Sequence, residues 1–150
     1  MGEIEGITPR EAQPKTQMRI LAVDDEPHLP KIFGRMARIS KMAEKIGVFD
    51  VVRNGREALK KLKEKPGDYN IVLSDLQMPE MNGLQVAEKL KDEPVSVYLV
   101  TGAADTISQE EMQRLGIQGI LEKPYTLENV NDFLERISKD LQKGEKNDIL

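Results

Sequence analysis

Short apolar runs alternate with helical patterns along most of the chain. Continuous apolar runs of a few residues are typical of parallel strands that are buried on both faces of a sheet. The five runs are Ile20–Val23, Val48–Val52, Ile71–Leu73, Val95–Val100 and Gly119–Leu121.

The segments between these runs repeat apolar residues at spacings of three and four, which is the period of an amphipathic helix. Turn signals of the Asn-Gly type precede the second and third of these stripes. The stripes run from Leu29 to Ile46, Ala58 to Leu62, Leu84 to Leu90, Ile107 to Leu115 and Leu127 to Leu141.

Five strands and five helices in strict alternation predict an α/β fold in which helices cover both faces of a parallel sheet. Right-handed crossovers leave few topologies. The common one for five such units is the flavodoxin-like, doubly wound sheet of order 2-1-3-4-5. We expect residues 18–142 to form this domain, residues 1–17 to form a flexible N-terminal arm, and residues 143–150 to form a frayed C-terminal tail.

Composition narrows the class of protein. The chain of 150 residues carries a net charge of −4, so no general attraction to nucleic acid or to an anionic membrane is expected. It contains no cysteine, which excludes disulfides and thiolate zinc sites. No apolar run is long enough to span a bilayer, and no apolar signal segment opens the chain. A cytoplasmic protein without direct membrane contact is therefore expected.

Chemically active side chains follow four of the five predicted strands. Asp24 and Asp25 come after the first strand, Asp75 after the third, Thr101 after the fourth and Lys123 after the fifth. In an open sheet of this kind, ligands bind outside the carboxyl ends of the strands. The predicted order makes the first and third strands neighbours, and also the third and fourth. We therefore expect three carboxylates to converge at one edge, with a hydroxyl and an ammonium beside them.

Three close carboxylates repel one another, and a hard divalent cation such as Mg²⁺ relieves that repulsion. The metal and the Lys123 ammonium could neutralise the charge on a transferring phosphoryl group, and the Asp75 carboxylate could accept that group as an acyl phosphate. Taken singly, each residue has a simpler explanation. Asp24 or Asp25 could cap a helix that begins near Pro27, and the others could be turn or surface residues. Their coincidence at one edge favours a site.

The chain resembles the receiver domain of bacterial two-component response regulators from about Arg19 to Leu141. The string Asp-x-x-Met-Pro-x-Met-x-Gly is by itself a strong match to this family. The presence of all the motifs in the family's order makes the match more specific still. The matching motifs are Asp24-Asp25-Glu26-Pro27, Asn54-Gly55-Arg56-Glu57-Ala58-Leu59, Asp75-Leu76-Gln77-Met78-Pro79-Glu80-Met81-Asn82-Gly83, Thr101-Gly102 and Lys123-Pro124.

The resemblance implies a metal and phosphoryl site. Asp75 would be the phosphoacceptor. Asp25 and Asp75 would bind Mg²⁺ directly, Asp24 would help through water, and the backbone carbonyl of Gln77 would complete the protein ligands. Lys123 would pair with the phosphoryl group.

The resemblance also implies a switch. Thr101 would swing toward the phosphoryl group, and a cis peptide would follow Lys123. The domain would catalyse only its own phosphorylation and dephosphorylation, as part of a phosphorelay. The phosphodonor would be a histidine kinase or a phosphotransfer protein. The output face would be the fourth helix, fifth strand and fifth helix, roughly residues 104 to 141. It would serve a downstream protein or an output domain, and homodimers through this face are common in the family.

Some positions depart from the family pattern. Ile120 stands where a Tyr or Phe often reports the threonine movement, and Asn82 replaces the more usual Asp. The segment from Asp25 to Asp75 is long for the family, and we expect it to lengthen the first helix around residues 41–45. Two other functions are open to the sequence: a binding module that no longer uses phosphorylation, and a magnesium-dependent phosphatase. The phosphatases usually carry an acid where Gln77 stands.

Overall fold

A computed structural model describes residues 17–149, with side chains described through residue 144. Apart from Gln17, the predicted N-terminal arm lies outside the described residues. Five parallel strands form one sheet in the order β2-β1-β3-β4-β5, which confirms the predicted fold. The strands are β1 Met18–Val23, β2 Ile46–Val52, β3 Ile71–Asp75, β4 Ser96–Thr101 and β5 Ile117–Glu122.

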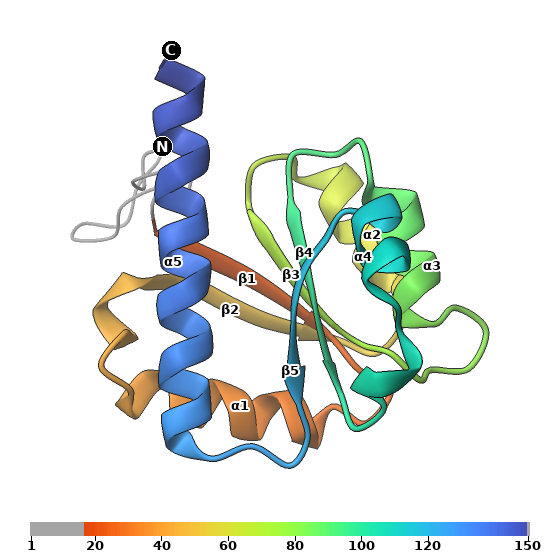
Figure 1. The fold of residues 1–150 in the computed structure, drawn as a ribbon, viewed down its shortest axis with the longest axis horizontal. Helices are drawn as coiled ribbons and strands as arrows, with labels where there is room; N and C mark the ends of the chain where they lie inside the picture. The colour runs from red at the N-terminus through yellow and green to blue at the C-terminus, as the bar shows by residue number, and fades with distance from the viewer. Residues whose placement is uncertain (1–16, 150) are drawn as a thin grey trace, which may run out of the picture.

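Helices alternate with the strands and cover both faces of the sheet (Figure 1). The α-helices of the described part are α1 His28–Ile39, α2 Gly55–Glu64, α3 Gly83–Leu90, α4 Gln109–Leu115 and α5 Leu127–Ile149, and two 3-10 turns are η2 Ala43–Lys45 and η3 Ala104–Thr106. No helix in this part of the chain has the length and apolar character needed to cross a membrane.

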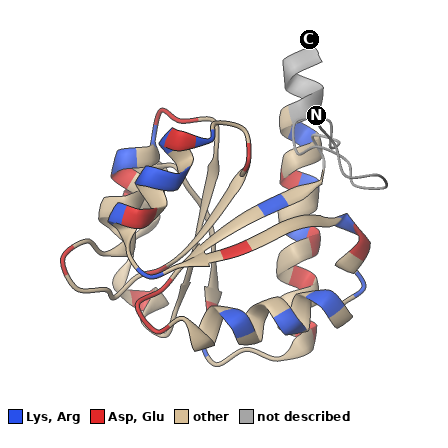
Figure 2. Ribbon diagram, turned by 180° about the vertical axis from the view of Figure 1, so that it is seen from behind, with Lys and Arg blue, Asp and Glu red and all other residues tan. Residues whose placement is uncertain are grey.

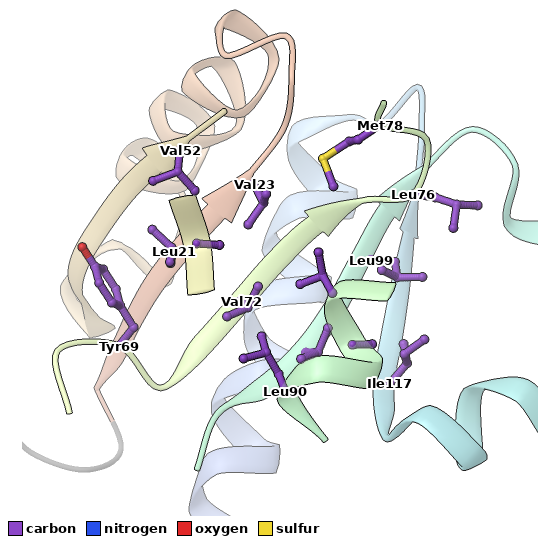
Figure 3. Packing of buried hydrophobic residues seen from close by; sticks show 14 of the residues in the cluster. Leu21, Val23, Val52, Tyr69, Val72, Leu76, Met78, Leu90, Leu99 and Ile117 are labelled. Atoms are coloured by element: carbon purple, nitrogen blue, oxygen red, sulfur yellow. The ribbon is translucent and has the colours of Figure 1, made fainter. Parts of the chain in front are cut away.

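The sheet separates two hydrophobic cores, because alternate side chains of each strand point to opposite faces. On β1, Ile20 and Ala22 pack with α1 and α5, whereas Leu21 and Val23 pack with the helices of the other face. Figure 3 shows the core that contains Leu21 and Val23, in which side chains from β1, β3 and β4 lie against α2, α3 and α4. Both faces of the strands are therefore buried, as their continuous apolar sequence predicted.

One polar contact crosses the core on the α1 and α5 side. Tyr98 of β4 is fully buried, and its hydroxyl donates a hydrogen bond of 2.8 Å to Asp140 of α5. Burial and this bond raise the pKa of the Tyr98 phenol. The ring also packs edge-on against Phe133 of α5, with 5.6 Å between the ring centroids. The strand that ends at Thr101 is thus tied to the last helix.

The predicted lengthening of the first helix around residues 41–45 is wrong. Helix α1 ends at Ile39, because Ser40 adopts an extended backbone with ψ of 167°. The Ser40 hydroxyl donates to the Ala37 carbonyl at 2.6 Å and accepts from the Met42 N–H at 3.1 Å, so it replaces the helical bonds that would continue. The apolar residues that follow serve another element, since Ile46 opens β2 and pairs with β1.

The last helix also differs from its prediction. Helix α5 continues to Ile149, where a frayed tail was predicted from residue 143. The predicted end rested on the polar character of the sequence. Lys, Glu and Gln are good helix formers, so a polar segment can continue a helix that packing has started. Helix α4 ends at Leu115, where its predicted apolar stripe ends, and Gly116 caps it with a left-handed backbone with φ of 69°.

The loop that follows β3 approaches the start of α3 closely. Asn82 caps α3 in a reciprocal capping box with Gln85, at 2.8 and 2.9 Å. The next residue, Gly83, donates its N–H to the Leu76 carbonyl at 2.9 Å. A Cβ atom at Gly83 would lie 2.5 Å from the backbone oxygen of Asp75. Glycine is therefore required where the helix meets the end of β3.

We expect Gly83→Ala to lower the free energy of unfolding by about 1–3 kcal/mol, because the added methyl group meets backbone atoms that cannot rotate away. Urea denaturation would measure the change. The matched control is Gly144→Ala in α5, where a Cβ would meet nothing within 4 Å. Helix propensity predicts that this control raises stability by up to ~1 kcal/mol. Equal stability of Gly83→Ala and the wild-type protein would contradict the steric argument.

Candidate functional site

Three carboxylates converge where β1 and β3 end. The two strands are paired with Val23 opposite Ser74, so the residues that follow, Asp24 and Asp75, emerge side by side. One carboxylate oxygen from each of Asp24, Asp25 and Asp75 lies within 4.8 Å of the others. The side chains of Asp24 and Asp75 are only 7% and 14% exposed, whereas Asp25 is exposed. The convergence expected from the strand order is present.

Lys123 places its ammonium group among these carboxylates. Its Nζ atom lies 3.5 Å from Asp75 Oδ1 and 3.6 Å from Asp24 Oδ2. The residue follows β5, and its backbone N–H donates to the Thr101 carbonyl at 2.9 Å, which anchors the loop to β4. The peptide bond between Lys123 and Pro124 is cis, as expected.

Thr101 lies at the end of β4 and is buried. Asp75 pairs with Val100 in the sheet, so Thr101 follows directly beside the acidic cluster. The Thr101 hydroxyl oxygen accepts a hydrogen bond from the Ala103 N–H at 3.0 Å, which holds the side chain within its own loop. The residue is thus at the expected place.

Gln77 lies in the loop between β3 and α3. Its neighbours Leu76 and Met78 are buried and fix the loop to the core, while the Gln77 side chain is exposed. Two residues after Met78, Glu80 has a left-handed backbone with φ of 67°, an uncommon conformation for a residue with a side chain. The role of the Gln77 carbonyl as a metal ligand stays a prediction.

The electrostatics of the cluster are set by burial. Burial raises the pKa of the Asp24 carboxyl, and the charges of Asp75 and Asp25 raise it further. The Glu26 N–H, which donates to Asp24 Oδ1 at 2.9 Å, and the Lys123 ammonium oppose this shift. The raised pKa shows that the two stabilising partners do not fully offset burial and repulsion. A bound divalent cation would relieve that repulsion, and hard oxygen ligands of this kind suit Mg²⁺.

Tyr125 belongs to this site and was missed by the sequence interpretation. Its ring lines a small cavity together with Asp24, Asp75 and Lys123. It packs edge-on against Phe33, with 5.9 Å between centroids. Burial raises the pKa of the Tyr125 phenol, and the charge of Asp24 adds to the shift. The position of Tyr125 two residues after Lys123 was the only signal in the sequence.

Comparison with known proteins identifies the family. The family model described as the response regulator receiver domain matches residues 20–135. Among curated proteins, two-component response regulator 24 of Arabidopsis thaliana is 28% identical over 127 residues, covering 83% of this chain and 86% of that protein.

Two further similarities differ in how much of the relative is matched. The signal transduction histidine-protein kinase BarA of Escherichia coli is 29% identical over 126 residues, covering 81% of this chain. The chain spans only 13% of the length of that kinase. Among solved structures, a response regulator receiver domain protein from Methanospirillum hungatei superposes with a TM-score of 0.68 at 26% identity, covering 87% of this chain and 98% of that one.

Removing the Asp24 charge should stabilise the metal-free protein. We expect Asp24→Asn to raise Tm at neutral pH by a few degrees in buffer without divalent cations, since about 2–4 °C corresponds to 1 kcal/mol in a domain of this size. The amide oxygen can still accept from the Glu26 N–H. Because the pKa is raised in the folded state, charged Asp24 costs stability at neutral pH. That cost disappears as the pH falls below the pKa of the unfolded chain.

Thermal unfolding followed by circular dichroism at several pH values would test this expectation. The gain should be largest at neutral pH and vanish in acid. Asp105→Asn, at an exposed residue of η3, is the matched control and should change the free energy of unfolding by no more than about 0.5 kcal/mol. A lower Tm for Asp24→Asn at pH 7 would show that the pairing with Lys123 outweighs burial and repulsion.

Proposed function

Because the chain belongs to the response regulator receiver domain family, we propose that Asp75 is its phosphoacceptor and that phosphorylation switches the domain. The observation that supports this most directly is the position of Lys123 Nζ, 3.5 Å from Asp75 Oδ1, within a cluster of three carboxylates. A structural ion pair would need one carboxylate. Three carboxylates with one ammonium are instead suited to bind a cation and a phosphoryl group together.

Asp24, Asp25 and Asp75 would hold Mg²⁺, with the Gln77 carbonyl as a further ligand. When bound, the metal would neutralise charge on the phosphoryl oxygens. An Asp75 carboxylate oxygen attacks phosphorus, an acyl phosphate forms, and the phosphorus–nitrogen bond of a donor phosphohistidine breaks. The donor imidazole keeps the electron pair of that bond and takes up a proton. Lys123 stabilises the negative charge of the group in transfer. Hydrolysis of the acyl phosphate would reset the domain.

The switch would begin at Thr101. In the described structure its hydroxyl oxygen accepts from the Ala103 N–H, and its O–H could donate to a phosphoryl oxygen on Asp75, which is a charged acceptor. A contact made in only one of two conformations shifts the equilibrium between them. The output face would be α4, β5 and α5. It would bind a downstream protein, an output domain or a second copy of the chain, and a cytoplasmic location stays a prediction.

Helix α1 offers a surface for the phosphodonor, a histidine kinase or a phosphotransfer protein. Two isoleucines on α1 are exposed, Ile32 at 42% and Ile39 at 73%. The same helix carries Lys31, Arg35 and Arg38 and no acidic residue, so it appears in Figure 2 with basic segments only. Exposed apolar residues between cations suit a partner helix with apolar and acidic positions. The helix begins at His28, close to Asp25, so a partner seated on it would reach Asp75.

Phosphorylation itself is tested by incubating the protein with Mg²⁺ and acetyl phosphate and measuring the intact mass. We expect one phosphate adduct, its loss on addition of a chelator with the donor, and no adduct for Asp75→Asn. Asp105→Asn, an exposed acid outside the site, should be phosphorylated like the wild-type protein. An adduct that persists in Asp75→Asn, or no adduct and no Mg²⁺ binding, would overturn the proposal. Rapid turnover of many phosphoesters would indicate a phosphatase instead.

The α1 surface makes a separate prediction. Ile39→Ser should slow phosphotransfer from a histidine kinase roughly tenfold, because burying one such side chain at an interface contributes about 1.5–3 kcal/mol. The kinase used would be the member of a purified panel that phosphorylates the wild-type chain fastest. Phosphorylation by acetyl phosphate should not change, since that small donor needs no docking surface. Lys60→Ser on α2 is the control, and an equal effect of both variants would argue against docking on α1.

A further inference from the structure

A groove of about 440 Å³ lies between α4 and β5. Its apolar lining includes Ile107, Met112 and Ile120, which pack against the core and are only half-buried, so part of each side chain is open to the groove. Two exposed carboxylates, Asp105 and Glu122, also line it. Within the described part of the chain, neither of them forms an ion pair. None of the residues proposed for phosphoryl transfer lines this groove.

The surroundings of the groove are acidic. One cation lines it, Arg136 of α5, and its guanidinium already donates to the Gln118 carbonyl at 2.9 Å. The exposed Glu110 in the first turn of α4 adds another acid nearby. Residues 104–135 as a whole contain seven Asp and Glu against two Lys and Arg. An occupant that fits this groove has apolar side chains for its interior and cations for its carboxylates.

Helix α1 carries this combination on its outer surface. Ile32 and Ile39 are two of the three large apolar side chains that are exposed in the described part, at 42% and 73%. Because a helix turns by about 100° per residue, Lys31, Arg35 and Arg38 share about a third of its circumference with the two isoleucines. Among the described residues, no carboxylate forms an ion pair with any of the three cations. The outer surface of α1 is thus apolar and positively charged.

The uneven spread of charge extends to the whole molecule. Residues 31–65, which include α1, β2 and α2, contain eleven Lys and Arg against four Asp and Glu. The acidic residues 104–135 include α4 and β5. Since β2 and β5 are the opposite edges of the sheet, one edge of the molecule is basic and the other is acidic. Two copies therefore attract each other head to tail.

We propose that α1 of one copy docks in the groove between α4 and β5 of a second copy. Ile32 and Ile39, roughly 10 Å apart along the helix, cover the apolar lining, and the cations of α1 pair with Asp105 and Glu122. Burial of the isoleucines drives the contact, and the charges fix its orientation.

The helix that enters the groove has to come from another molecule. Within one copy, α1 packs through Phe33 and Ala37 on one face of the sheet. The groove lies on the other face, where Met112 and Ile120 pack against the second core. Helix α1 therefore cannot reach the groove of its own chain.

This contact joins two different surfaces, so it does not close on itself. Each added copy still has one free α1 or one free groove, and the assembly grows with concentration. A copy whose α1 is docked also has its proposed phosphodonor surface covered. The groove belongs to the face proposed for output, but docking needs neither phosphorylation nor a kinase. It therefore holds or fails independently of the function proposed for Asp75.

Analytical ultracentrifugation of the full chain over a wide range of concentration gives the first test. At low salt we expect the average mass to rise with concentration beyond that of a dimer. Added salt should weaken the association at least tenfold, because it screens charges at the surface. A monomer at every concentration, or association that salt does not weaken, would overturn the proposal. So would association that ends at a dimer, because a contact between identical surfaces closes at two copies.

Two complementary variants test which surfaces meet. The first carries Ile32→Ser with Ile39→Ser and keeps an intact groove, and the second carries Asp105→Lys with Glu122→Lys and keeps an intact α1. Each alone should associate at least tenfold more weakly than the wild-type protein. Mixed in equal amounts, they should form a heterodimer and grow no further. A mixture that stays monomeric, or variants that each assemble like the wild-type protein, would overturn the docking of α1 in the groove.

A matched control separates the groove from net charge. Asp92 and Glu93 are exposed acids between α3 and β4 that do not line the groove. Asp92→Lys with Glu93→Lys changes the net charge as much as the groove variant does, and it should associate within about threefold of the wild-type protein. All the substituted side chains are exposed, so circular dichroism should show an unchanged fold. Equal weakening by this control and by the groove variant would show that net charge alone causes the association, and would overturn the proposal.

Discussion

Repulsion among three carboxylates is the constraint around which the site is built. Asp24, Asp25 and Asp75 are held within 4.8 Å because β1 and β3 are neighbours in the sheet, and the folded chain cannot separate them. The Lys123 ammonium and the Glu26 N–H compensate only in part, as the raised pKa of Asp24 shows. The two cores on either side of the sheet must therefore stabilise a cluster that works against folding. Strain of this kind is typical of functional sites.

Much of the fold follows from alternation in the sequence. Continuous apolar runs identified the strands, and the rule that parallel strands end at one edge predicted that Asp24, Asp75, Thr101 and Lys123 lie close together. Those inferences depend on periodicity and topology, which are global properties. The order of the strands was confirmed because it rests on that topology. The cis peptide after Lys123 was confirmed as the resemblance to the receiver family implied.

The features that were predicted wrongly lie where one local sequence suits two different structures. The apolar stripe after Ile39 suited a helix as well as a strand, and the Ser40 hydroxyl, through two hydrogen bonds, ended the helix. The end of α5 was predicted to be a frayed tail because its sequence is polar, although polar residues such as Lys, Glu and Gln also form helices. Tyr125 was missed because its role comes from where the ring lies in space, against Phe33 and beside Asp24, and no spacing in the sequence encodes that contact.

The hydrogen bond between Tyr98 and Asp140 connects the position of β4 to that of α5. Successive side chains of this strand enter opposite cores: Leu99 lies among the helices α2, α3 and α4, and Tyr98 lies against α5. A small shift of β4 near Thr101 would therefore move side chains in both hydrophobic cores. Ile120 packs against the core on the side of α2, α3 and α4, and β4 is joined to α5 by the Tyr98–Asp140 bond and the ring contact with Phe133. The end of β4 beside the acidic cluster is therefore connected through the interior of the protein to its last helix.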